Sequence, residues 1–90
     1  MAYKKDRIYY YLVQLILKLK DKEQADEFFK VMFTPKEFEQ LKIRIQILQM
    51  LKKGMLQRDI ANKLKIGIAT VTRGSNMLKQ YEFEMLDRVR

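Results

Sequence analysis

The chain has 90 residues and a mass of 10.9 kDa, which corresponds to one domain or to a half-domain completed by a second copy. Hydrophobic residues make up 48% of it, too many for a disordered tail. It contains no cysteine and no histidine, which excludes disulfides, Cys/His metal sites, thiol nucleophiles and histidine bases. The net charge of +8 predicts an anionic partner, either nucleic acid or an acidic membrane surface.

The N-terminal segment superficially resembles a secretory signal, because basic residues precede the apolar run 8–17. No small-residue cleavage site follows, and Lys18 and Lys20 close the run. A helix over this run covers only about 18 Å, whereas a bilayer core is roughly 30 Å thick. We therefore expect a soluble, cytoplasmic protein with no membrane segment.

The sequence predicts an all-α fold of six helices. The first helix is expected at residues 4–20, where apolar residues recur at helical spacing and a second apolar set covers another face. A chain of this length cannot bury such a helix in its own core, so we expect it to be buried in a dimer. A second helix is expected at residues 22–32.

Helix-start signals mark the third helix. Thr34 is suited to the N-cap, Pro35 to the first helical position and Glu37 to a capping box. The helix is expected to run to about Lys53, with apolar stripes on two sides, and to stop at Gly54.

Residues 57–79 have the pattern of a helix-turn-helix with a turn at 65–67. Lys65 occupies the left-handed turn position, where many such motifs have glycine. Ala61 is small where the second helix passes over the first. The remaining residues, 82–90, are predicted to form a C-terminal helix. Four apolar residues occupy the positions where the two short helices pack together: Ile60, Leu64, Ile66 and Val71.

In this motif the second helix, 68–79, would lie in the major groove of DNA. Its first residues have short side chains, none of which offers the bidentate pairing typical of strong base readout. Sequence choice would then depend on thymine methyl contacts, water bridges and DNA shape. Lys63 is interpreted as a solvated cation. The predicted DNA-contact residues are Gln57, Arg58, Gly67, Ile68, Ala69, Thr72, Arg73, Asn76 and Lys79.

The run Gly-Ile-Ala-Thr-Val-Thr-Arg-Gly-Ser-Asn at 67–76 resembles the recognition helix of the tryptophan repressor family. The similarity extends back through Gln57, Arg58 and Arg44 to Phe33-Thr34-Pro35 and covers roughly residues 30–80. It implies a six-helix, intertwined homodimer with residues 1–53 as the dimerisation core. It also implies operator DNA and the corepressor L-tryptophan as partners.

The resemblance further implies a set of ligand-binding residues. Arg44 and Arg73 would sandwich the indole, and Arg73 would hold the carboxylate with help from Thr34. Backbone carbonyls near Val31 and Phe33 would accept from the ammonium. Taken singly, Thr34 is explained as an N-cap, Arg44 as a surface cation and Gly74 as a close helix contact. The full implied set is Val31, Phe33, Thr34, Arg44, Thr70, Arg73, Gly74 and Met77.

Two departures from the family pattern bear on this site. Met77 stands where a serine in some relatives helps to hold the ammonium group. The turn at 54–57 is one residue shorter than the usual form, and Leu56 replaces a Ser/Thr cap, a loss of about 1 kcal/mol.

The leading hypothesis is a tryptophan-activated repressor. The first alternative is a DNA-binding regulator of the same fold that acts without tryptophan or with a different ligand. The second is a basic helical adaptor for protein or acidic lipid. An enzyme is disfavoured because no residue set has a catalytic layout, and no cofactor or metal is expected.

Overall fold

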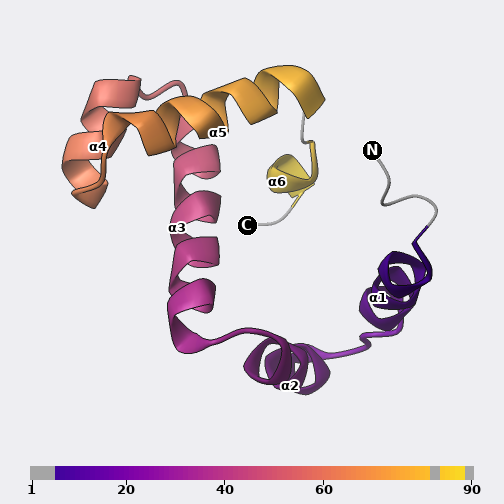
Figure 1. The fold of residues 1–90 in the computed structure, drawn as a ribbon. Coiled ribbons are helices and arrows are strands. Elements are labelled where there is room, and N and C mark those ends of the chain that lie inside the picture. Colours follow the sequence, from indigo (N-terminus) through magenta and orange to yellow (C-terminus); the bar gives the residue numbers. More distant parts are fainter. Residues whose placement is uncertain (1–5, 82–83, 89–90) are drawn as a thin grey trace. The chain divides into compact units, whose positions relative to one another are not determined.

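The computed structural model describes residues 6–81 and 84–88, and within these residues it contains six helices and no strand (Figure 1). The chain divides into two compact units, Met1–Pro35 and Lys36–Arg90, which are described separately below. None of the helices in the described ranges is long and apolar enough to cross a membrane. The helices are α1 (Arg7–Leu17), α2 (Lys22–Met32), α3 (Pro35–Lys52), α4 (Gln57–Leu64), α5 (Ile68–Tyr81) and α6 (Met85–Arg88).

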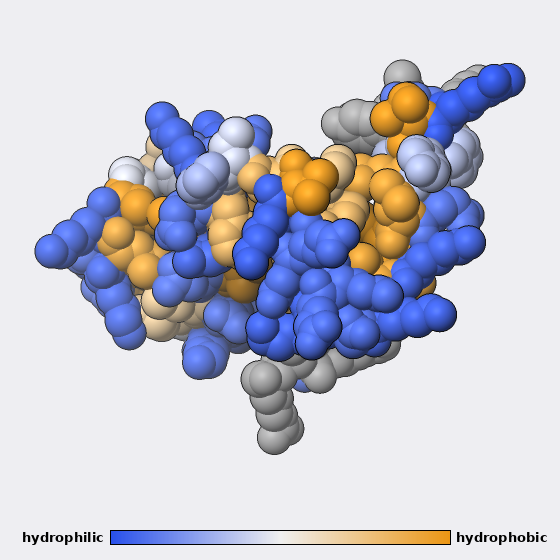
Figure 2. Space-filling view, turned by 90° about the horizontal axis from the view of Figure 1, so that it is seen from below, coloured by the Kyte–Doolittle hydropathy of each residue, from blue (hydrophilic) through white to orange (hydrophobic). Residues whose placement is uncertain are grey.

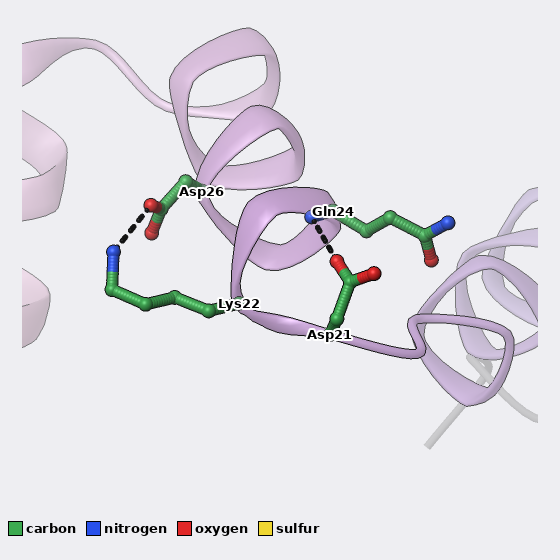
Figure 3. Close-up of polar contacts among 4 residues, drawn as sticks. All are labelled: Asp21, Lys22, Gln24 and Asp26. Carbon is green, nitrogen blue, oxygen red and sulfur yellow. Dashed lines mark hydrogen bonds and ion pairs between the residues drawn. The ribbon is translucent and has the colours of Figure 1, made fainter.

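Aspartate side chains cap both helices of the first unit. The Asp6 carboxylate accepts from the Ile8 N–H at 2.9 Å, and the Asp21 carboxylate accepts from the Gln24 N–H at 2.9 Å (Figure 3). Such caps satisfy backbone donors that a helix start leaves unpaired. One turn into α2, the Lys22 ammonium contacts Asp26 at 2.8 Å (Figure 3). This hydrogen bond lowers the pKa of Asp26 and raises the pKa of Lys22.

The first helix is shorter than the predicted 4–20, whereas α2 has the predicted bounds. Helix α1 ends at Leu17, and the Lys18 N–H bonds back to Gln14 at 3.1 Å. The Lys20 N–H instead donates to the Gln24 side chain at 2.9 Å, so the chain here already belongs to the start of α2. Apolar periodicity continues past Leu17, but the Asp21 cap needs an extended backbone before α2. Residues 4 and 5 lie outside the described residues.

Large apolar side chains of the first unit are exposed. Neither α1 nor α2 has a buried residue, and Ile8, Leu17 and Val31 are 72%, 72% and 75% exposed. Figure 2 shows apolar side chains among polar ones on the face of the molecule that it presents. The apolar character predicted for α1 is therefore present, and its burial in a dimer stays a prediction.

Helix α3 begins at Pro35 and ends at Lys52, within one residue of the prediction. Gly54 follows with φ +87°, and the Met55 N–H bonds back to Met50 at 3.1 Å. A glycine in this left-handed conformation is a common way to end a helix. In the single chain Ile47 is 2% exposed and Ile45 is 41% exposed, so burial of α3 on two sides stays a prediction that depends on a dimer.

The core of the second unit joins α3, α4 and α5. It consists of Ile47, Ile60, Ala61 and Val71, with Leu64 and Ile66 packed against it as predicted. Full burial of an aliphatic side chain of this size contributes about 1.5–3 kcal/mol. In Figure 1, α5 lies across the C-terminal half of α3, with α4 beside both.

The C-terminal region departs from the predicted bounds. Helix α5 continues to Tyr81 rather than 79, and α6 spans only Met85–Arg88 instead of 82–90. Residues 82, 83, 89 and 90 lie outside the described part of the chain. The Lys52 ammonium meets the Asp87 carboxylate at 3.3 Å and ties α6 to the end of α3.

Candidate functional site

Helices α4 and α5 are fixed against each other by backbone hydrogen bonds in the turn between them and by a buried apolar contact. Ile60 and Val71 are fully buried, and Ala61 is 7% exposed, so its small side chain allows the helices to approach closely. The Ala61 carbonyl accepts from the N–H groups of Lys65 and Ile66. Lys65 adopts φ 56° and ψ 48°, the left-handed conformation predicted for this turn position. The pair therefore has a fixed mutual orientation.

The N-terminal turn of α5 presents the predicted base-reading side chains to the surface. Ile68 is 51% exposed, and Ala69 and Thr72 are also exposed, whereas Val71 points into the core. The Thr72 hydroxyl donates to the Gln57 side-chain oxygen at 2.7 Å. This bond uses only the side-chain oxygen of Gln57, so the NH2 group of the same amide can still donate to another partner. Both residues belong to the predicted DNA-contact set, but their contact was not predicted because it joins positions 15 residues apart.

Basic side chains surround this surface. Arg58, Lys63, Arg73 and Lys79 are all exposed, and within the described residues none of the four has an ion-pair partner. Asp59 is the only acidic residue between positions 54 and 80. The three predicted phosphate-contacting cations, Arg58, Arg73 and Lys79, are therefore available to an external anion. No group of three or more carboxylates in the described ranges is arranged to hold a metal ion.

Gly74 lies where α5 packs against α3. A Cβ atom built there would lie 3.0 Å from Ile47 Cγ2 and 3.7 Å from Leu48 Cδ2 and Leu51 Cδ1. A side chain at this position would force Ile47 to shift. The structure thus supports the plain explanation for this glycine, a close contact between helices, and does not test its predicted role beside a ligand.

The two predicted indole-stacking arginines flank this crossing. Arg44 lies one turn before Ile47 on α3, and Arg73 immediately precedes Gly74 on α5. Both side chains are exposed. Thr70, at i−3 from Arg73, is also exposed. These residues belong to one unit and lie around one contact between helices.

A groove lies one turn further along α5. It holds about 220 Å³ of free space and is lined by Leu48, Met77, Leu78 and Tyr81. Met77 is 47% exposed and offers only a weak thioether acceptor, at the position where a serine was expected in some relatives. Of these four residues, only Met77 was predicted as a site residue. Leu78 and Tyr81 could have been found from their spacing along α5, one and four residues after Met77. Leu48 could not, because only the packing of α5 against α3 places it beside them.

The other three predicted ligand residues belong to the first unit. Val31 lies at the end of α2, Phe33 is its half-buried C-cap, and Thr34 immediately precedes α3. The Phe33 N–H donates to the Phe29 carbonyl at 3.1 Å. Their participation in one site with Arg44 and Arg73 stays a prediction.

Comparison with known proteins agrees with the resemblance carried by residues 30–80 and extends it. The family described as Trp repressor protein matches residues 9–88, which takes in α1, α2 and α6. A Trp operon repressor homolog of Vibrio campbellii is 46% identical over 69 residues, 76% of this chain and 69% of the relative. A Trp operon repressor homolog of Vibrio parahaemolyticus is also 46% identical over 69 residues, 76% of this chain and 67% of the relative.

A further namesake in Actinobacillus succinogenes is 44% identical over 66 residues, 72% of this chain and 63% of the relative. No solved structure matches the chain. Since the family match spans nearly all of the helices described above, the chain belongs to the Trp repressor family.

Proposed function

We propose that this chain is a transcriptional repressor that binds operator DNA as a homodimer and takes L-tryptophan as its corepressor. Membership of the Trp repressor family supports a regulatory DNA-binding role. The relatives' printed name, Trp operon repressor homolog, supports the tryptophan connection. The α4–α5 pair is the proposed helix-turn-helix.

One observation carries the DNA-binding proposal. At the start of α5, Val71 is completely buried while Ile68, Ala69 and Thr72 are exposed. The helix is thus anchored on one side, and short side chains cover the side that would face base edges. Ile68 and Ala69 suit contacts with thymine methyl groups, which places more of the specificity on DNA shape and bridging water.

The surrounding polar groups suit the DNA backbone. Arg58, Arg73 and Lys79 are exposed cations without ion-pair partners among the described residues. The Gln57 amide, oriented by Thr72, adds a neutral donor. Phosphate contacts of this kind set the register of a protein on a duplex and give binding its salt dependence.

For the corepressor, Arg44 and Arg73 supply two planar cations around the α3–α5 crossing. Stacking of an indole on a guanidinium contributes about 0.5–2 kcal/mol per face. A ligand held by one residue on each helix would favour one angle of α5 against α3. In a dimer, that angle would decide whether the two α5 helices reach successive major grooves, about 34 Å apart.

A second candidate, a regulator of the same fold without tryptophan, is favoured by the packing at Gly74. Ile47 already occupies the space beside this glycine, with its Cγ2 atom 3.0 Å from the Cβ position. Met77 also removes a hydroxyl from the end of the site where the ammonium is expected. Both features would reduce the room and the polarity that an amino acid requires.

One titration separates the candidates. A tight-binding duplex is first selected from a random library by the purified protein, and its affinity is then measured by fluorescence anisotropy with and without L-tryptophan. The proposal predicts a 5–150-fold gain in affinity with the amino acid, the usual range of allosteric coupling. Equal affinity selects the second candidate. No binding even at low salt contradicts both and favours an adaptor for protein or lipid.

Three arginine variants test the assignment of residues. Arg73→Ala is expected to weaken both tryptophan and DNA binding, Arg44→Ala mainly tryptophan, and Arg58→Ala mainly DNA. Isothermal titration calorimetry measures the affinity for tryptophan, and fluorescence anisotropy measures the affinity for DNA. Ile68→Lys is expected to change operator preference while the dimer stays folded. Full tryptophan-dependent DNA binding by Arg73→Ala would contradict the proposed pocket.

A further inference from the structure

Lys65 occupies a backbone conformation that suits glycine better. Among the described residues it is the only non-glycine residue with positive φ, at φ 56° and ψ 48°. In this conformation the Cβ atom crowds the following carbonyl, and glycine escapes the penalty because it has no Cβ. A lysine here therefore makes the turn less stable than it could be.

No ion pair of the Lys65 side chain within the described residues compensates for this strain. The Lys65 side chain is exposed, and in the described ranges no carboxylate lies within ion-pair distance of its ammonium. The contacts that fix the turn come from backbone groups, since the Lys65 and Ile66 N–H groups both donate to the Ala61 carbonyl. A glycine would keep these contacts. The fold therefore does not require the lysine side chain at this position.

The turn that contains Lys65 lies just before the proposed DNA-contacting start of α5. Lys65 lies three residues before Ile68, where α5 begins and where the exposed base-reading side chains are found. The surface between them is open, because a Cβ atom added at Gly67 would meet nothing within 4 Å. A duplex that receives the start of α5 in its major groove brings a phosphate strand past the residues just before that helix.

We propose that Lys65 is an additional phosphate-contacting residue, retained in a strained turn because its ammonium binds the DNA backbone beside α5. This inference rests on the proposed function. It assigns a residue that the predicted DNA-contact set omitted and explains why a lysine occupies this left-handed position.

The proposal predicts opposite effects on folding and on binding. Lys65→Gly should raise the melting temperature by about 4 °C, as strain is relieved but the unfolded chain becomes more flexible. At 50 mM salt the DNA affinity of the proposed dimer should fall about a hundredfold, roughly tenfold for each Lys65. Because the dimer loses two phosphate contacts, the salt slope should fall by about 1.8, so the deficit should shrink about twelvefold by 200 mM salt.

Three further variants make the test specific. Lys65→Asn is neutral and tolerates the left-handed conformation, so it should behave like the glycine variant. Lys65→Arg keeps both the charge and the strain and should retain wild-type affinity and salt slope. Lys30→Gln removes the same charge from exposed α2 and should leave the salt slope unchanged.

The experiment is anisotropy on the selected duplex at several salt concentrations, together with thermal unfolding of each free protein. A more stable Lys65→Gly protein with unchanged affinity and slope overturns the proposal and leaves the proposed function intact. A lower melting temperature for Lys65→Gly would show that lysine is not strained in this turn, and it too overturns the proposal. Absence of salt-dependent DNA binding by the wild-type protein overturns both.

Discussion

In the second unit, Ile47, Ile60 and Val71 are almost completely buried, whereas no residue of α1 or α2 in the first unit is buried. Apolar content does not explain this contrast, because α1 is the most apolar of helices α1–α5 and α4 is the least apolar. The difference is that α3, α4 and α5 cross one another and exclude water from a common centre. Apolar periodicity can give a helix an apolar face, but that face is buried only where other helices pack across it.

The first unit also differs in what it lacks. Its two described helices contribute exposed Ile8, Leu17 and Val31, and a segment of fewer than about 40 residues rarely buries enough surface to be stable alone. We propose that a second copy of the chain covers these side chains, in keeping with the expected homodimer. The second unit would then supply binding, and the first would supply association.

The largest expected effect is in the core of the second unit. Ile60→Ala should lower the free energy of unfolding by about 2–5 kcal/mol, because it leaves a cavity between α4 and the helices that cover it. Urea unfolding measures the loss. The matched variant Ile68→Ala, at a half-exposed position, should change stability by about 0.5 kcal/mol or less. Equal losses for the two variants would contradict the comparison.

The next effect concerns association through α1. Leu17→Lys keeps helix propensity but places a charge on a side chain that is 72% exposed in the single chain. If a second copy covers Leu17, the variant should raise the dimer dissociation constant tenfold or more, roughly the worth of one buried leucine. Analytical ultracentrifugation measures it. Gln14→Lys on the same helix is the control, and an unchanged dimer in Leu17→Lys would remove α1 from the interface.

A smaller, stabilising effect is expected at the start of α4. Leu56 is the N-cap of α4 in extended conformation and makes no side-chain cap hydrogen bond. Leu56→Ser should raise the free energy of unfolding of the second unit by about 1 kcal/mol, by adding an acceptor for an unpaired N–H group. Leu56→Ala, which offers no acceptor, should give no such gain. Equal stability of the two variants in thermal unfolding would show that the cap is not formed.

The smallest effect is in α2. The Lys22 hydrogen bond lowers the pKa of Asp26, so the pair stabilises the helix above the unfolded-state pKa of Asp26. That contribution is lost as the pH falls through the lowered value. Lys22→Gln should therefore reduce helicity slightly at neutral pH and not in acid, as followed by circular dichroism. A difference that persists in acid would show that it does not come from this ion pair.

The sequence predicted helix boundaries well where local chemistry sets them. Pro35, Gly54 and the turn at 65–67 act through φ and capping, which depend on neighbouring residues alone. The end of α1 was predicted too far along, because the Asp21 cap of the next helix outweighed continuing apolar periodicity. The apolar α4–α5 contact was also predictable, since its members recur at helical spacing.

Contacts between distant positions could not be predicted in this way. The Thr72–Gln57 hydrogen bond, the Ile47–Gly74 approach and the groove beside Met77 each join different helices. They depend on the angle at which α5 crosses α3 and α4, and no local pattern encodes that angle.

We propose that the α4–α5 pair carries DNA recognition while α1 and α2 do not. Amide chemical shifts of the isotope-labelled protein, recorded during titration with the selected duplex, test this division residue by residue. The largest changes are expected at positions 57–58 and 65–73, with α2 nearly unaffected. Changes centred on α1 and α2, with the start of α5 silent, would contradict it.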